Sequence, residues 1–135
     1  MGFTLDPQLA ADTLSLGRID FVDIRLMQDA RFAWLVLVPQ IEGAQEWQDL
    51  PRAQAHDLLD ISTQCADALR AITAAEKMNI AALGNMVRQL HVHVIARQTN
   101  DAAWPGPVWG VGTAQAYTPA ALAEISDKIK AALNL

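Results

Sequence analysis

The segment Gln89-Leu90-His91-Val92-His93 decides how this chain is interpreted. In a β-strand, alternate side chains point to the same face. We therefore expect Gln89, His91 and His93 to share one face, with the imidazoles roughly 6–7 Å apart along the strand. Leu90 and Val92 would face the core. On the opposite face, one imidazole can attack or bind a ligand while the other imidazole and the amide orient it.

Two segments upstream predict an antiparallel hairpin. Arg18 to Met27 alternates apolar and polar residues, and a change of phase at Phe21-Val22 predicts a β-bulge. Gln28 to Arg31 is polar and turn-like. Phe32 to Val38 is a continuous apolar run, typical of a strand buried on both faces.

Three segments predict helices. Asp6-Pro7 pairs an N-cap with a proline at the first helical position, and Gly17 is expected to close that region. Arg52 to Lys77 carries apolar residues at spacings of three and four. Thr118-Pro119 opens a final helix by the same cap-and-proline logic. The expected apolar stripes of the two longer helices are Leu58, Ile61, Cys65, Leu69, Ile72 and Leu122, Ile125, Ile129, Leu133.

The remaining elements complete an α+β fold. Asn79 to Leu83 predicts a short strand that Gly84-Asn85 breaks, and Val87 to Arg97 predicts the strand that holds the histidines. Residues 98–117 are irregular. The order of elements predicts one domain over residues 1–135, with an antiparallel sheet, one long central helix and shorter terminal helices.

Composition restricts the partners and the compartment. The net charge of −5 argues against binding to a nucleic acid polymer, which needs clustered Lys and Arg, but allows a single nucleotide as ligand. The lone cysteine, Cys65, excludes an internal disulfide and is expected to be a small buried hydrophobe. The longest apolar run is far shorter than the roughly 20 residues of a membrane span. No secretory signal is visible, so we expect a cytoplasmic protein without a membrane partner.

Two histidines at this spacing allow other interpretations. On the two residues alone, ordinary surface histidines would be favoured. A metal site through His91 and His93 is a second possibility, but it needs a third ligand. His56 is the only other histidine, we expect it at the surface, and the carboxylates show no recognisable ligand spacing. No metal and no cofactor is predicted.

The context of the histidines resembles the histidine triad (HIT) superfamily. Its signature alternates three histidines with apolar residues, and this chain has Gln89-Leu90-His91-Val92-His93-Val94-Ile95. Gly84-Asn85-Met86-Val87 is similar to the segment that commonly precedes the triad, and Trp104-Pro105 recurs after it in some members. The resemblance covers roughly residues 18–110, including the hairpin and the long helix.

The resemblance implies a small α+β nucleotide hydrolase or nucleotidyltransferase, often a homodimer, that cleaves phosphoramidates or dinucleoside polyphosphates. His91 matches the histidine that forms a covalent nucleotidyl intermediate. His93 and Gln89 match the third and first histidines, and Asn85 matches a polar residue that contacts phosphate or the leaving group. Gln28 or Asp29 could bind ribose, although a simple turn explains both at least as well. Neutral imidazole is nucleophilic at pH 7, and such a reaction requires no metal.

Three departures from the family pattern bear on activity. Gln89 replaces the first histidine and cannot titrate. Met86 stands where many members have Ser or Thr. Trp34 stands near the position where many members have a further histidine. Losing one transition-state donor can cost on the order of 10²–10³ in rate. A non-catalytic nucleotide-binding or sensing protein is therefore the second hypothesis.

Four further residues are less decisive. Arg88 and Arg97 flank the triad and could attract phosphate, but surface placement is favoured for both. Trp104 and Trp109 could wall a pocket or simply pack against the sheet.

Overall fold

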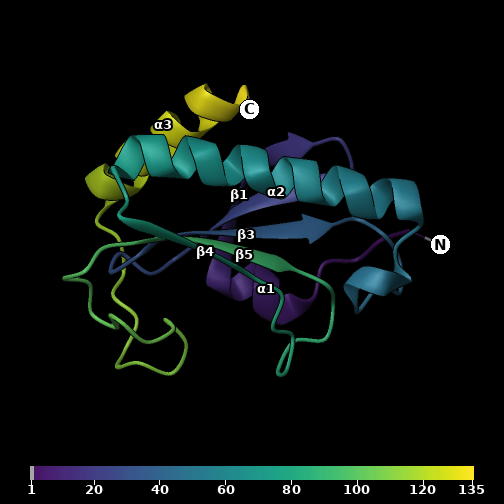
Figure 1. Ribbon diagram of the computed structural model, residues 1–135, viewed down its shortest axis with the longest axis horizontal. Helices are drawn as coiled ribbons and strands as arrows, with labels where there is room; N and C mark the ends of the chain where they lie inside the picture. The colour runs from purple at the N-terminus through teal and green to yellow at the C-terminus, as the bar shows by residue number, and fades with distance from the viewer. Residues whose placement is uncertain (1) are drawn as a thin grey trace.

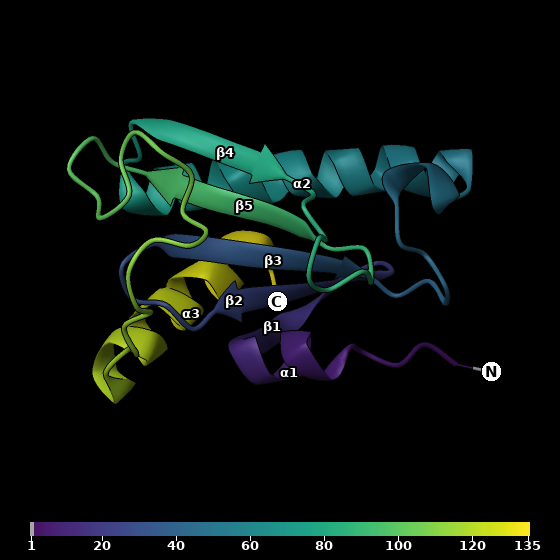
Figure 2. The same cartoon turned by 90° about the horizontal axis from the view of Figure 1, so that it is seen from below.

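A five-stranded antiparallel sheet forms the centre of the computed structural model, which describes residues 2–135 (Figure 1). Met1, the first residue of the expected domain, lies outside the described residues. The strands run in the order β1-β2-β3-β5-β4 across the sheet (Figure 2). The elements are α1 (Pro7–Asp12), β1 (Thr13–Ile19), β2 (Val22–Met27), β3 (Ala33–Pro39), the 3₁₀ turn η1 (Trp47–Asp49), α2 (Arg52–Thr73), β4 (Lys77–Ala81), β5 (Val92–Arg97) and α3 (Pro119–Leu133).

The two faces of the sheet are covered differently. The long helix α2 and the C-terminal helix α3 lie over one face, and the short helix α1 and the loop of residues 98–117 lie against the other (Figure 1). Strand β3 follows the alternation of a buried strand: Leu35 and Leu37 pack in the α2 core, whereas Val36 packs in the opposite cluster with Leu9 and Val108. The predicted α+β fold, with its antiparallel sheet and long central helix, is confirmed.

The predicted helix starts are confirmed by their caps. The Asp6 carboxylate accepts a hydrogen bond from the Gln8 N–H at 2.8 Å, and Pro7 occupies the first turn. The Thr118 hydroxyl caps α3 by accepting from the Ala121 N–H at 3.2 Å. None of the described helices is long and apolar enough to cross a membrane.

The expected strand over residues 18–27 is wrong in its extent. Ile19 ends β1 and pairs with Val22, and the two residues between them form a tight turn in which Asp20 has a φ of 50°. The change of phase at Phe21-Val22 therefore marks a hairpin turn and not a bulge. A register shift does occur earlier, between Ser15 and Gly17, so Gly17 lies inside a strand and does not close the helical region.

Three boundaries in the middle of the chain also differ from expectation. Helix α2 ends at Thr73, where Ala74 takes a left-handed conformation, and β4 begins at Lys77, so the strand expected over residues 79–83 lies two residues earlier. Strand β5 begins at Val92, five residues after its predicted start. The Leu90 N–H donates to the Ala44 carbonyl at 3.0 Å and not to a neighbouring strand, which ends the pairing there.

Candidate active site

A pocket of about 290 Å³ opens on the face of the sheet that α1 covers in part. His93 lies on strand β5, and His91 is the residue directly before that strand. Trp34 lies on strand β3. The complete lining is Leu9, Asp12, Met27, Trp34, Leu83, Gly84, Asn85, Met86, Val87, His91, His93 and Trp109. The structure therefore brings the two predicted histidines together with Asn85. On the other face, Leu90, Val92 and Val94 enter the main core, as predicted.

His91 is fixed by the backbone just before it. Its Nδ1 lies 2.7 Å from the carbonyl oxygen of Gln89. A carbonyl oxygen can only accept a hydrogen bond, so Nδ1 must carry the proton of the neutral ring. The lone pair then resides on Nε2. His91 lines the pocket and is only 6% exposed, so this lone pair belongs to a sheltered imidazole.

His93 is held in the opposite tautomer. The indole Nε1–H of Trp34 donates to its Nδ1 at 3.0 Å, which leaves the proton of the neutral ring on Nε2. Burial first, and the neighbouring His91 second, lower the pKa of His93 from 6.5 to about 3. The two imidazoles meet edge to face with ring centroids 4.8 Å apart. The two hydrogen bonds thus leave Nε2 of His91 as an acceptor and Nε2 of His93 as an N–H donor.

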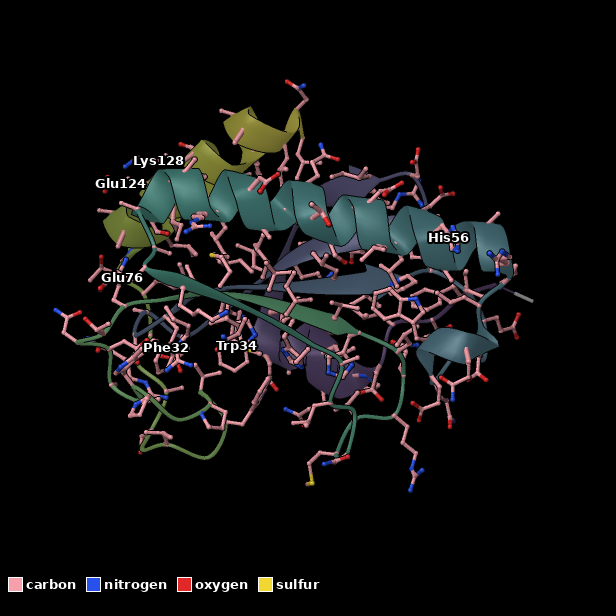
Figure 3. All side chains as sticks on the ribbon, viewed as in Figure 1. Phe32, Trp34, His56, Glu76, Glu124 and Lys128 are labelled. Carbon is pink, nitrogen blue, oxygen red and sulfur yellow. The ribbon has the colours of Figure 1, made fainter. Side chains whose placement is uncertain are left out.

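Aromatic rings close the pocket around His93. Trp109 meets the imidazole edge to face with centroids 4.9 Å apart, and it meets Trp34 at 6.1 Å. Phe32 packs edge to face against Trp34 with centroids 6.4 Å apart, and both rings lie beneath the sheet (Figure 3). Both interpretations of Trp109 hold, because it lines the pocket and also packs against the apolar cluster on this face of the sheet.

The expectation that Gln89 shares the pocket face of the histidines is wrong, because its side chain bonds the N-terminal segment instead. Its side-chain oxygen accepts from the Asp6 N–H at 2.9 Å, and its amide nitrogen donates to the Thr4 carbonyl at 2.9 Å. The side chain is absent from the lining of the histidine pocket. Its amide ties down the N-terminal segment, and its backbone carbonyl is the group that contacts His91.

The loop before the histidines contributes a mixed surface. Asn85 is exposed and lines the histidine pocket, with its amide available to a ligand. Met86 lines the same pocket but is 95% exposed, and it supplies no hydroxyl donor.

Gln28 and Asp29 line a second cavity of about 490 Å³ that shares Asp12, Trp34 and other walls with the histidine pocket. The Gln28 side chain donates to the Ala11 carbonyl at 3.3 Å. Asp29 is buried, and its carboxylate accepts bonds from Arg31 and from the Gln115 N–H. Burial alone would raise the pKa of Asp29, but these hydrogen bonds outweigh it and lower the pKa below its usual value.

Arg97 corrects one expectation. It is not a surface residue: it is 1% exposed, pairs with Asp101 at 2.7 Å and stacks over the ring of Trp104. Arg88 is exposed, as expected. His56 is also exposed, on α2 and across the sheet from Trp34 (Figure 3).

A third metal ligand beside the histidines was the requirement for a metal site. Among residues 2–135, no group of three or more His, Cys, Asp or Glu side chains is arranged to hold a metal ion. Cys65 is buried as predicted, and burial raises the pKa of its thiol to about 12. It is therefore an inert core residue.

Sequence reasoning missed two features of the site. Trp34 was noted for what it replaces, but not as the hydrogen-bond partner of His93. Asp12, at the end of α1, lines both cavities and carries no sequence signal beyond its place in a short helix. In both cases the residue lies far along the chain from the histidines that it accompanies.

Comparisons with known proteins agree with the geometry. The HIT domain family matches residues 9–100. A histidine triad protein from Marinobacter aquaeolei VT8 is 41% identical, with a TM-score of 0.96 over 99% of this chain and 98% of that one. A histidine triad protein from Bradyrhizobium japonicum is 39% identical, with a TM-score of 0.95 over 97% of this chain and 98% of that one. One from Sinorhizobium meliloti 1021 is 43% identical, with a TM-score of 0.93 over 96% of each chain. A comparison with curated proteins gives no significant match.

The family match spans more than half of the chain, and the similarity to these three structures extends over nearly all of it. The histidine pocket lies at the segment that first suggested the family. The chain therefore belongs to the HIT family, whose fold serves nucleotide hydrolases and transferases.

Proposed function

We propose that this protein is a nucleotide phosphate hydrolase or nucleotidyltransferase that acts through a covalent nucleotidyl-histidine at His91. Its substrates are phosphoramidates or dinucleoside polyphosphates. One observation carries the proposal: the Gln89 carbonyl, 2.7 Å from Nδ1, leaves the Nε2 lone pair of a sheltered imidazole free for attack.

The reaction runs in two displacements. The Nε2 lone pair of His91 attacks phosphorus, an N–P bond forms, and the P–N or P–O bond to the leaving group breaks. The leaving group takes a proton from solvent, and the Gln89 carbonyl keeps its bond to the Nδ1–H of the cationic ring. Water then attacks phosphorus: a P–O bond forms, the N–P bond breaks with its electron pair returning to Nε2, a proton passes to solvent, and the nucleoside monophosphate leaves. The Nε2–H of His93 donates to a non-bridging phosphate oxygen in both steps.

The other residues bind the substrate in this scheme. The exposed amide of Asn85 contacts the phosphate or the leaving group at the mouth of the pocket. The nucleoside occupies the adjoining cavity, beside Gln28 and Asp29. Because the Asp29 carboxylate already accepts several hydrogen bonds, its contribution includes holding the wall of that cavity. Gln89 acts through its backbone carbonyl.

A second candidate is a non-catalytic nucleotide-binding or sensing protein. Two observations favour it: the amide of Gln89 is engaged with Thr4 and Asp6, and Met86 offers no hydroxyl to a phosphate. A donor-poor site can retain affinity while losing rate, because donors that act in the transition state contribute mainly to turnover.

Intact-protein mass spectrometry decides between the two candidates. Wild type, His91→Ala and His56→Ala are mixed with adenosine phosphoramidate or a dinucleoside polyphosphate, with and without EDTA. We expect adduct or product from wild type and from His56→Ala, the exposed-histidine control, with or without EDTA, and none from His91→Ala. If no variant reacts while saturable binding persists, the binding-protein candidate replaces the enzyme.

We also propose a homodimer that works in the cytoplasm, where nucleoside phosphates are abundant. Support for the dimer comes from β4, an edge strand on which Ile80 is 49% exposed and after which Leu83 is 47% exposed. Light scattering during size-exclusion chromatography tests the dimer. A mass of one chain at micromolar concentration would contradict it.

A further inference from the structure

Trp34 and His93 form a buried hydrogen-bonded pair between neighbouring strands. Val36 of β3 lies opposite His93 of β5, so Trp34 stands on the diagonal, two residues along the same face. The indole and the imidazole are tilted by 54° with centroids 5.6 Å apart, and the indole N–H reaches Nδ1 at 3.0 Å. Both residues are nearly inaccessible to solvent, at 6% and 4% exposure.

This bond has a chemical consequence for the imidazole. An indole N–H can only donate, so Nδ1 of His93 must be an acceptor and the ring's own proton must reside on Nε2. A second proton at Nδ1 would break the bond inside a buried site, where an unmet donor is costly. The ring is therefore restricted to one neutral form, with its N–H available to the pocket.

We propose that Trp34 is a positioning residue: it holds His93 as a neutral Nε2–H donor to the phosphate of the substrate. The assignment rests on the proposed function for its kinetic meaning, but the state of the ring is measurable without turnover. At other histidines a carboxylate or a backbone carbonyl orients the imidazole. Here the indole N–H of Trp34 orients it.

The charges around the ring are few. Among the described residues that line the pocket, the titratable ones are Asp12, at the end of α1, His91 and His93 itself. Strand β3 presents Trp34 and Val36 to the imidazole, β4 presents Ala81, and the loop after β5 presents Trp109. Burial and the nearby His91 lower the pKa of His93 to about 3, which agrees with a ring that stays neutral.

Trp109 provides a matched comparison for the role of Trp34. Its ring also contacts His93 edge to face, at 4.9 Å, but within residues 2–135 no hydrogen bond joins the two side chains. Replacing either tryptophan by phenylalanine keeps an aromatic ring against the imidazole. Only Trp34→Phe removes a donor from Nδ1, so the difference between the two variants isolates the hydrogen bond from packing.

Nuclear magnetic resonance of ¹⁵N-labelled protein tests the pair directly. In wild type we expect a scalar coupling across the hydrogen bond between Nε1 of Trp34 and Nδ1 of His93, with Nδ1 unprotonated. Trp109→Phe should keep the coupling. In Trp34→Phe the proton affinity of the His93 ring should rise about five- to tenfold, as expected for the loss of one hydrogen bond. Absence of the coupling in wild type overturns the proposal, whether or not the variants fold.

Kinetics with adenosine phosphoramidate test the consequence for the reaction. Trp34→Phe should lower kcat about tenfold with KM changed less than about twofold, because a poorly oriented donor is lost mainly in the transition state. If wild type shows the coupling but turns over no nucleotide, the proposed function is wrong, but Trp34 still fixes the tautomer and orientation of His93. If wild type is active and Trp34→Phe changes neither kcat nor the proton affinity of His93, the positioning role falls and the function stands.

Discussion

The backbone carbonyl of Gln89 and the Nδ1 of His91 are joined at 2.7 Å, while the side chain of Gln89 points to the N-terminal segment. The residue at the first triad position thus has two separate contacts. The carbonyl contact depends on the course of the chain and survives any change of side chain. The amide contacts, with Thr4 and Asp6, depend on the glutamine itself.

Gln89→Ala should therefore affect stability more than chemistry. Loss of the two amide hydrogen bonds is expected to lower the free energy of unfolding by about 1 kcal/mol. Turnover should fall less than about tenfold, since His91 keeps its backbone acceptor. Denaturant titration and steady-state kinetics measure the two effects. A loss of activity as complete as that of His91→Ala would mean that the amide takes part in the reaction.

Much of this site was predictable because local pattern determines it. The alternation around the histidines placed Leu90, Val92 and Val94 in the core, and the caps at Asp6 and Thr118 located two helix starts. Periodicity and capping act over a few residues, so they can be read directly from the sequence.

The errors come from contacts between distant segments. Residues 87–91 have strand-like alternation, but the Leu90 N–H bonds to Ala44, so no strand forms there. Trp34 and His93 are 59 positions apart, and Asp29 and Gln115 are 86 apart. Pairings at such separation depend on how the sheet and loops pack, which no local pattern contains.

Asp101→Asn should destabilise the fold through Arg97. The side chain of Arg97 is 2% exposed and pairs with Asp101 at 2.7 Å, so removing the negative charge leaves a buried cation uncompensated. We expect a loss of about 3 kcal/mol in the free energy of unfolding, measured by denaturant titration. The control is Glu124→Gln, in an exposed pair with Lys128, which should cost less than about 0.5 kcal/mol. Equal effects of the two variants would contradict a structural role for the buried pair.

The same pair predicts how stability responds to acid. The hydrogen bonds from Arg97 lead the effects that lower the pKa of Asp101 from 3.8 to about 2. A carboxylate with a lowered pKa stabilises the folded state above its unfolded pKa and loses that effect as pH falls through the folded value. About 2 kcal/mol should therefore be lost between pH 4 and pH 2, and Asp101→Asn should lack that component.

His93 predicts a second dependence on pH, at milder acidity. Its pKa falls from 6.5 to about 3 on folding, chiefly by burial, so below pH 6.5 the unfolded chain binds a proton that the folded chain rejects. The free energy of unfolding should therefore fall by about 2 kcal/mol between pH 6.5 and pH 5. Denaturant titrations at several pH values measure this slope. His93→Gln should flatten it, whereas the exposed His56→Gln should not; a slope unchanged in His93→Gln would show that His93 accepts its proton while folded.

Asp29 and Arg31 should act on nucleotide binding as one unit. Asp29 binds Arg31 at 2.8 Å and the Gln115 N–H at 3.2 Å, and Arg31 donates to the Val111 carbonyl at 2.6 Å. The pair thereby joins the turn after β2 to the loop that carries Trp109, so either change should release the same wall of the larger cavity.

A double-mutant cycle of Asp29→Ala and Arg31→Ala tests this dependence, with AMP affinity measured by calorimetry. Each single variant is expected to weaken binding about tenfold, and the double variant hardly more than either one, because removing one partner already frees the loop. If Asp29 instead binds the ribose directly and independently of Arg31, the two effects will add, and the double variant will weaken binding about a hundredfold. Additivity would thus show that Asp29 contacts the substrate directly, and that the Asp29–Arg31 pair does not act on binding as one unit.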